Sequence, residues 1–207
     1  IQFGKENVLA VKVDHSQERD SRWYTGSGIY RNTYLVYAPL VHIDLWGVYF
    51  KANSITDKKA EVSIETSLKN ETTAAAQVEV IHEIVDPQTG KVVASSSKKQ
   101  TLAGNSTTTL EQVATLKNPK RWSLEQPTLY TVRTLVKQNG KVTEQNEQNL
   151  GLRTLTFDAN KGFALNDQWM KLKGVCIHHD AGVLGSAVPR DVWKRRLETL
   201  KGMGCNA

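Results

Sequence analysis

Cysteine is scarce in this sequence of 207 residues: there are two, Cys176 and Cys205, and both lie in the last quarter of the chain. A disulfide-rich fold is therefore excluded. Two cysteines cannot complete a zinc site by themselves, although His178 and His179 follow Cys176 closely. Each cysteine stands in an apolar segment, where we expect a reduced, buried thiol. A disulfide between them stays open at this stage.

Long apolar runs are also missing. No stretch approaches the roughly 20 apolar residues of a membrane-spanning helix, so we expect no membrane partner. The first residues lack the basic, apolar and small-residue order of a signal peptide, but such a signal would lie upstream of a partial sequence. Localisation is therefore not predicted, and a periplasmic or extracellular parent protein is left open.

Aromatic residues are few and scattered. They make up 7% of the chain, and the five tryptophans fall in separate segments, so no stacking platform for bases or sugars is evident. The net charge is +6, but the basic residues form short groups separated by acidic or neutral stretches. We interpret them as solvated surface charge and expect no nucleic-acid partner.

What the sequence has in abundance is alternation of apolar and polar residues, which is typical of strands. Residues 59–70 place Val62, Ile64 and Thr66 on one face, and residues 76–86 place His82 among apolar neighbours, so we interpret His82 as a core residue. Turn sequences separate the strands: "DPQTGK" follows the second of these segments, and "QNGK" is typical of a two-residue hairpin. The pattern predicts a mainly β chain with an immunoglobulin-like antiparallel β-sandwich over about 39–153.

Two further segments read as strands at the ends of the chain. Residues 7–14 alternate in the same way, and "GIYRNTYLVY" follows after a long connection, but two strands are too few to close a core. Near the other end, the polar turn "LNDQ" precedes an apolar segment at 170–177 that predicts a strand.

An amphipathic helix should follow that segment. Trp193, Leu197 and Leu200 recur at helical spacing between Pro189, which suits a first turn, and Gly204, which suits a C-terminal cap. The apolar "CNA" then restarts a strand-like segment. Strand, loop, helix and strand in this order are typical of a parallel βα series, which needs neighbouring strands. We therefore expect both ends of the chain to belong to neighbouring domains.

Two motifs resemble one family. "NVLAVKVDHSQERDSRWYTGSGIYRNTYLV" is similar to the end of the sugar-binding domain of glycoside hydrolase family 2, where an "AVxVD" strand leads to "RWYxGxGIYR". "FALNDQWMKLKGVCIHHDAGVLGSAV" with "RRLETLKGMGCNA" is similar to the start of that family's (β/α)8 barrel. The resemblance implies jelly-roll strands at 1–38, the immunoglobulin-like sandwich at 39–153, and the first strand and helix of a truncated barrel at 154–207.

The resemblance implies retaining hydrolysis of terminal β-glycosidic bonds, which needs two carboxylates about 5 Å apart. In the family both are glutamates on later barrel strands, and the acid/base lies in an Asn-Glu pair. The pairs Asn70-Glu71 and Asn146-Glu147 fall in the sandwich, where we interpret them as turn or surface residues. We therefore expect the catalytic glutamates beyond Ala207, no catalytic residue within this chain, and no hydrolysis by the chain alone.

Substrate-binding residues are implied at the end of the first barrel strand, because barrel strands present functional groups at their C-terminal ends. His178 matches the family's sugar-contacting histidine, and His179 and Asp180 would orient it or shape the rim. Asp20 would correspond to an acidic residue that some members place at the edge of the active site. The structural alternative for His178 is a loop histidine satisfied by the backbone.

The implied substrate of the parent protein is an oligosaccharide or β-glycoside. Similarity of "GVCIHHD" and "LKGMGCNA" to galactosidase-like members favours β-galactosides, while β-glucuronides and β-mannosides stay open. No cofactor or metal site is expected in this chain, although some relatives bind Mg²⁺ or Na⁺, and a homo-oligomeric parent stays open. The alternative function is a non-catalytic carbohydrate-binding or adhesive β-sandwich module, which would have no use for the C-terminal βα unit.

Overall fold

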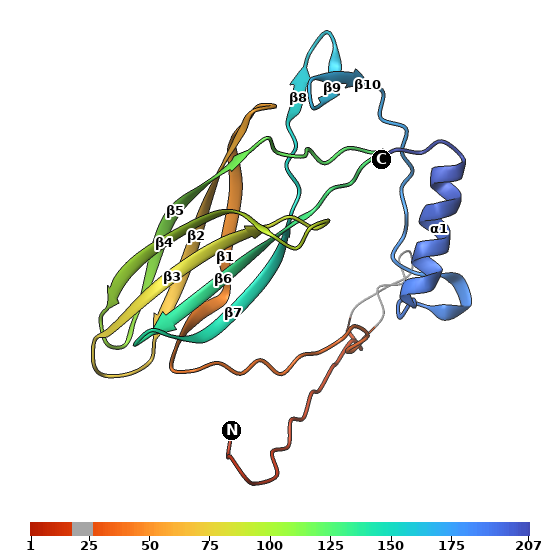
Figure 1. The fold of residues 1–207 in the computed structure, drawn as a ribbon. Coiled ribbons are helices and arrows are strands. Elements are labelled where there is room, and N and C mark those ends of the chain that lie inside the picture. The colour runs from red at the N-terminus through yellow and green to blue at the C-terminus, as the bar shows by residue number, and fades with distance from the viewer. Residues whose placement is uncertain (18–26) are drawn as a thin grey trace. The chain divides into compact units, whose positions relative to one another are not determined.

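Strands β1 to β7 form two antiparallel sheets that pack face to face in a computed structural model describing residues 1–17 and 27–207 (Figure 1). One sheet has the order β1-β2-β5, and the other has the order β4-β3-β6-β7. The strands are β1 (Val41–Ile55), β2 (Lys59–Asn70), β3 (Ala76–Val85), β4 (Val92–Leu102), β5 (Ser106–Lys117), β6 (Tyr130–Gln138) and β7 (Lys141–Leu150). The predicted immunoglobulin-like sandwich is confirmed, and its chain crosses between the sheets after β2, β4 and β5.

The core lies between the sheets and follows the alternation of the sequence. Val62, Ile64 and Thr66 of β2 are fully buried, as are Val80 and Ile84 of β3. Their neighbours in sequence on the outer faces are mostly charged or polar, as expected for a sheet with one solvated face. His82 is also fully buried within this core, so its interpretation as a core residue is confirmed.

Both predicted turns form. Asn139 and Gly140 have φ values of 51° and 77° and join β6 to β7, which is the geometry of a two-residue type I′ hairpin. At the turn between β3 and β4, the Gly90 amide donates to the Asp86 carbonyl (2.9 Å), and Gly90 has a φ of 68°. The sequence could predict these turns because their backbone angles require glycine or asparagine.

Asn70 corrects one interpretation. It is fully buried rather than a turn or surface residue. Its side-chain Nδ2 donates to the backbone carbonyls of Ala74 (2.9 Å) and Ala103 (3.0 Å), and its side-chain Oδ1 accepts from the backbone amide of Thr72 (3.0 Å). One side chain therefore joins the loops that follow β2 and β4, because buried amides must find hydrogen-bond partners. Asn146, the other asparagine considered, is half-buried on β7.

A bulge in β1 was not predicted. The pairing of β1 with β2 shifts between Ile43 and Val48, and the inserted residues include Leu45 and Trp46, which are 70% and 89% exposed. Trp46 has a φ of 57°, which is rare for a large side chain. Gly47, the next residue, packs tightly against neighbouring backbone: a Cβ at this position would lie 2.6 Å from the Asp44 carbonyl oxygen. The bulge therefore requires glycine at 47.

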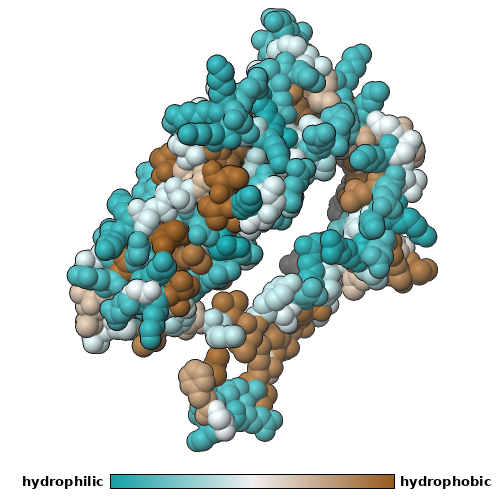
Figure 2. All heavy atoms as spheres, in the orientation of Figure 1, coloured by the Kyte–Doolittle hydropathy of each residue, from teal (hydrophilic) through white to brown (hydrophobic). Residues whose placement is uncertain are grey.

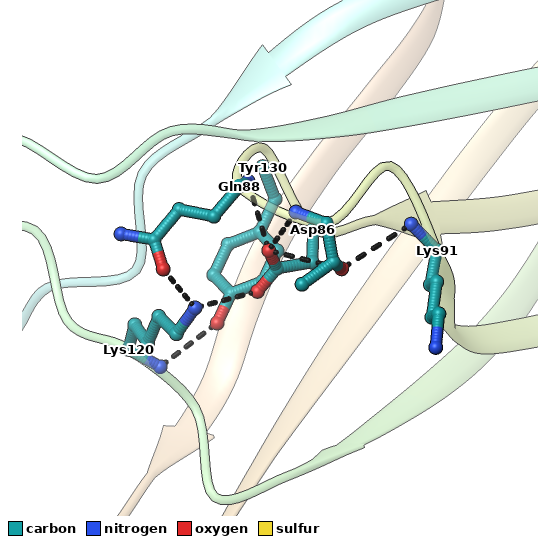
Figure 3. Close-up of polar contacts among 6 residues, drawn as sticks. Asp86, Gln88, Lys91, Lys120 and Tyr130 are labelled. Atoms are coloured by element: carbon teal, nitrogen blue, oxygen red, sulfur yellow. Dashed lines mark hydrogen bonds and ion pairs between the residues drawn. The ribbon is translucent and has the colours of Figure 1, made fainter.

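A buried carboxylate ties the β3–β4 turn to the loop before β6 (Figure 3). Asp86 accepts from the amides of Gln88 (2.9 Å) and Thr89 (3.0 Å), and from the Lys120 ammonium (2.9 Å). Lys120 also donates to Gln88 Oε1 (2.7 Å), and its amide donates to the Tyr130 hydroxyl (2.8 Å). These donors, led by Lys120, lower the pKa of Asp86 to about 2.

We predict that Lys120→Met lowers the urea midpoint of the sandwich at pH 7, because it leaves the Asp86 carboxylate without its cation. The carboxylate stabilises the fold above its ordinary pKa of 3.8, and this contribution is lost as the pH falls toward 2. The midpoint difference between wild type and Lys120→Met should therefore shrink between pH 5 and pH 2, which urea titrations at these pH values measure. An exposed-lysine variant, Lys98→Met, is the control and should leave the midpoint unchanged. A pH-independent difference would contradict the prediction.

A small antiparallel sheet follows the sandwich. It has the order β10-β9-β8 and consists of β8 (Leu155–Asp158), β9 (Gly162–Leu165) and β10 (Gln168–Met170). The predicted "LNDQ" turn joins β9 to β10, with φ values of 51° and 66° at Asn166 and Asp167. Asn166 donates to the Trp122 carbonyl (2.9 Å) and accepts from the Thr154 amide (3.1 Å), which fastens this sheet to the loop before β6. Val36–Lys171 accordingly form one compact unit.

Ile1–Leu35 and Leu172–Ala207 make up the second unit. Helix α1 (Arg190–Gly202) is confirmed, and Gly204 after it has a φ of 90°. The strands expected at 7–14 and in "GIYRNTYLVY" are wrong, because neither segment forms a strand. The strand expected at 170–177 is also wrong, since only Met170, the last residue of β10, belongs to a strand. Strands need neighbours for their backbone hydrogen bonds, and the described part of the chain pairs these segments with no other strand.

Apolar side chains remain at the surface of this second unit. Helix α1 buries none of its residues, and Leu197 in its apolar stripe is 55% exposed. Figure 2 shows apolar residues gathered along the coil that leads into β1, where Tyr34 and Leu35 are each 79% exposed. No helix in the described ranges has the length and apolar character needed to cross a membrane.

Candidate functional site

The residues implied as substrate-binding lie in the loop between the 170–177 segment and α1. A single 3₁₀ turn, η1 (Gly182–Leu184), interrupts this loop. Gly182 and Gly185 have φ values of 56° and 57°, so the loop reverses direction at positions where glycine is favoured. His178, His179 and Asp180 stand immediately before this reversal.

His178 and Asp180 are in direct contact. The His178 Nδ1 lies 2.6 Å from Asp180 Oδ1. This hydrogen bond to His178 is the main cause that lowers the pKa of Asp180 below its usual value. The His178 ring also faces the His179 ring, with centroids 4.8 Å apart. The structure therefore brings three of the four predicted substrate-binding residues together.

Helix α1 supports the loop through Arg196. The Arg196 Nη1 donates to the backbone carbonyl of Asp180 (2.9 Å), and the guanidinium lies over the Trp193 ring at 5.1 Å. His178, Asp180 and Arg196 line an open depression of about 640 Å³, together with the apolar residues Val175, Ile177 and Leu200. A concave surface lined by apolar residues and a few polar groups is typical of a small-ligand site.

The two apolar segments that flank α1 meet at one point. The Asn206 amide donates to the Lys173 carbonyl (2.8 Å), and the Lys173 amide donates to Asn206 Oδ1 (2.7 Å). A Cβ on Gly174 would lie 2.8 Å from the Ala207 carbonyl oxygen, so the backbones approach closely there. Of the predicted strand–helix–strand unit, the described residues therefore contain the helix, and only this short contact in place of paired strands. Sequence reasoning missed the part that Asn206 plays in it.

The remaining predictions for this region have mixed outcomes. Asp20 lies outside the described residues. Cys176 is exposed and Cys205 is half-buried, and neither forms a disulfide, so the expectation of buried thiols is wrong. Val175 and Ile177 on either side of Cys176 are also partly exposed, as is Met203, two residues before Cys205. The described residues contain no group of three or more His, Cys, Asp or Glu side chains that could hold a metal ion.

Comparison with known proteins places these features in context. A sequence profile of the glycosyl hydrolases family 2 matches residues 41–153, which span the sandwich. The chain is 38% identical over 206 residues to a β-galactosidase of Bacteroides ovatus, covering all of this chain and 24% of that protein. It is 35% identical over 207 residues to a protein of Formosa agariphila named as a putative β-glucuronidase, covering all of this chain and 19% of that protein.

A solved structure gives the same picture. The crystal structure of a glycosyl hydrolase family 2 member from Bacteroides cellulosilyticus superposes with a TM-score of 0.88 and 36% identity, over 94% of this chain and 26% of that one. The chain thus spans about a quarter or less of the length of the curated relatives described above.

Proposed function

Because this chain belongs to glycoside hydrolase family 2, we propose that it is the middle part of a larger enzyme that hydrolyses terminal β-glycosidic bonds with retention of configuration. The observation that carries this proposal is the match of the family profile to the sandwich, together with relatives that are glycosidases and cover the whole chain. The same relatives are about four to five times as long as the region they share with it.

We propose that the three regions expected from the sequence have different roles. Residues 1–38 would complete a sugar-binding jelly-roll domain, and 154–207 would open the (β/α)8 catalytic barrel. The sandwich at 39–153 would act as a rigid spacer between them, since it is held by a continuous core and by side chains such as Asn70 that join its loops. This division predicts that the chain by itself hydrolyses no glycoside.

Within the parent enzyme, His178 would contact a sugar hydroxyl at the rim of the barrel. Three observations support this: its place after the Gly174-Val175 segment, its exposure, and the open depression around it. Hydrogen bonds to substrate hydroxyls assist catalysis when they strengthen as charge develops in the transition state. The two catalytic carboxylates would come from barrel strands outside this chain. The Mg²⁺ or Na⁺ that the family resemblance implies for the parent enzyme would take its ligands from outside this chain too; the described residues contain no group of three or more His, Cys, Asp or Glu side chains that could hold a metal ion.

A β-galactoside is the substrate we favour, and a β-glucuronide is the second candidate. The Bacteroides ovatus relative is named as a β-galactosidase, while the Formosa agariphila relative carries the glucuronidase name, at 38% and 35% identity. The parent enzyme should be assayed with 4-nitrophenyl β-galactoside, β-glucuronide and β-mannoside. We expect the galactoside to have the highest kcat/KM. A higher value for the glucuronide would replace the galactoside assignment, and no hydrolysis of any of the three would contradict the proposed function.

A further inference from the structure

Trp46 occupies a backbone conformation that large side chains do not favour, and it gains no burial from it. Its φ of 57° lies in the left-handed region, where bulky residues are outliers, yet most of its surface is exposed, as is that of Leu45 beside it. Strained backbone of this kind persists only where the surrounding structure enforces it, and it gathers at sites of function. The bulge in β1 therefore displays two large apolar side chains at a cost in conformational energy.

Two hydrogen bonds and a glycine enforce the bulge. Ile43, the last residue paired in register before it, donates its backbone amide to Glu144 Oε2 (2.7 Å). Glu144 belongs to β7, the edge strand of the other sheet, so this bond joins the two sheets beside the bulge. Leu45 donates its backbone amide to Asp44 Oδ1 (2.9 Å). Any side chain in place of Gly47 would collide with the Asp44 carbonyl. The conformation of the bulge is thus built into the sandwich.

Protection of a sheet edge does not explain this bulge. β1 has one strand neighbour, β2, so it is an edge strand, and bulges at edges discourage pairing with other chains. Protected edges carry charged residues or proline, whereas this one presents Leu45 and Trp46. Tryptophan is enriched among the residues that dominate the energy of protein–protein contacts. The bulge therefore has the features of a protein-contact surface.

The bulge lies close to the point where the chain enters the sandwich. Leu45 is four residues beyond Val41, the first residue of β1, which is about 13 Å along a strand. The entry segment before β1 is apolar and exposed as well, at Val36, Tyr37 and Leu40. Entry segment and bulge thus present apolar side chains at the same end of β1.

The chain leaves the sandwich at the opposite end. From Glu144, beside the bulge, β7 continues for six residues to Leu150, which is about 20 Å along a strand. The small sheet of β8 to β10 follows, and Figure 1 shows it at the end of the sandwich away from the entry segment. A domain attached before the sandwich is therefore closer to the bulge than a domain attached after it.

We propose that Leu45 and Trp46 dock against the domain that precedes the sandwich in the parent enzyme, on the part of that domain upstream of Ile1. The identity of this partner rests on the proposed function, in which 1–38 complete a sugar-binding domain. Relatives of the chain extend well beyond it, since about three quarters or more of their length lies outside the shared region. Covalent attachment at the entry segment keeps the preceding domain at high effective concentration beside the bulge, which favours it over a second copy of the chain.

Trp46→Asn separates docking from folding. Asparagine tolerates a positive φ, so the urea midpoint of the 207-residue chain should stay unchanged or rise. In the parent enzyme the same change removes an interface tryptophan, and chymotrypsin should cleave after Tyr37 at least about tenfold faster. Val113→Asn is the matched control, at an exposed position of β5 on the other edge of the sheet, and should leave this cleavage rate unchanged. A lower midpoint of the chain, or an unchanged cleavage rate in the parent, would overturn the proposal.

A photo-cross-link identifies what covers the bulge. Leu45→p-benzoylphenylalanine in the parent enzyme, irradiated and digested for mass spectrometry, should cross-link to a peptide upstream of Ile1. The same group in Val113→p-benzoylphenylalanine should give no such product. A cross-link to the polypeptide beyond Ala207, to a second copy, or only within the 207 residues would contradict the assignment, as would the absence of any cross-link.

The outcomes distinguish this surface from the proposed function. If the upstream cross-link forms in a parent that hydrolyses no β-glycoside, the docking surface stands and the proposed function fails. If an active parent cross-links elsewhere, only the docking surface fails.

Discussion

Replacing His82 by glutamine should remove most of the acid sensitivity of the sandwich between pH 6.5 and pH 4. In the wild type we expect the free energy of unfolding to fall by about 3 kcal/mol across this window, at a limiting slope of about 1.4 kcal/mol per pH unit. Burial lowers the pKa of His82 from 6.5 to about 4 in the folded protein. The unfolded chain therefore binds the proton first, and falling pH favours unfolding.

The position of His82 explains this sensitivity. It lies on β3 with no exposed surface, and its Nε2 and Nδ1 meet the hydroxyls of Thr66 (3.2 Å) and Thr134 (3.1 Å). Thr66 belongs to one sheet and Thr134 to the other, so the ring joins the two layers. Both partners are neutral and offer no charge to compensate a buried imidazolium, which is costly in an apolar core.

Urea titrations at intervals from pH 8 to pH 4 measure the effect, and the difference between the curves of wild type and His82→Gln isolates this residue from the carboxylates. His82→Gln should be less stable than wild type at pH 8 and nearly independent of pH in the window. His42→Gln, at a half-exposed histidine, should keep the wild-type slope. A wild type that loses no stability between pH 6.5 and pH 4 would contradict this account of the core.

Two isoleucines on one strand should differ widely in what they contribute. Ile84 and Ile81 both lie on β3, but Ile84 has no exposed surface and faces the core, whereas Ile81 is half-buried on the outer face. We expect Ile84→Ala to cost about 2–5 kcal/mol, because it leaves a cavity that the two sheets cannot close. Ile81→Ala should cost about 1 kcal/mol or less.

Urea unfolding at pH 8 compares the two isoleucine variants under conditions in which His82 is neutral in both the folded and unfolded chains. The comparison is matched in residue type, strand and atoms removed, so the difference reports burial. Equal losses for Ile84→Ala and Ile81→Ala would show that β3 does not divide into a core face and an outer face.

The sandwich was predictable because its signals are local. Alternation assigned Val62, Ile64 and His82 to the core, and the residues at Asn139 and Gly140 dictated the hairpin. Asn70 was misassigned because nothing in its own neighbourhood indicates that it joins loops more than thirty residues apart, as its hydrogen bond to Ala103 shows. The bulge at Trp46 was missed for a similar reason: its "DLWG" sequence continues an apolar strand pattern.

The candidate site was predictable in part. The motif located His178, His179 and Asp180, and helical spacing located α1, but neither could show that Arg196 would hold the Asp180 carbonyl. That contact depends on how the loop returns to the helix. The strands expected at 7–14 and 170–177 failed for a related reason. Alternation shows that a segment could form a strand with one buried face, but a strand forms only when a neighbouring strand pairs with it.

One measurement tests the central claim most directly: hydrolysis of 4-nitrophenyl β-galactoside by the parent enzyme and by the 207-residue chain, side by side, with ¹H NMR of the first sugar anomer released. The account predicts that the parent releases the β-anomer, as a retaining enzyme does, and that the chain releases nothing above the buffer blank. Release of the α-anomer by the parent, or hydrolysis by the isolated chain, would contradict it.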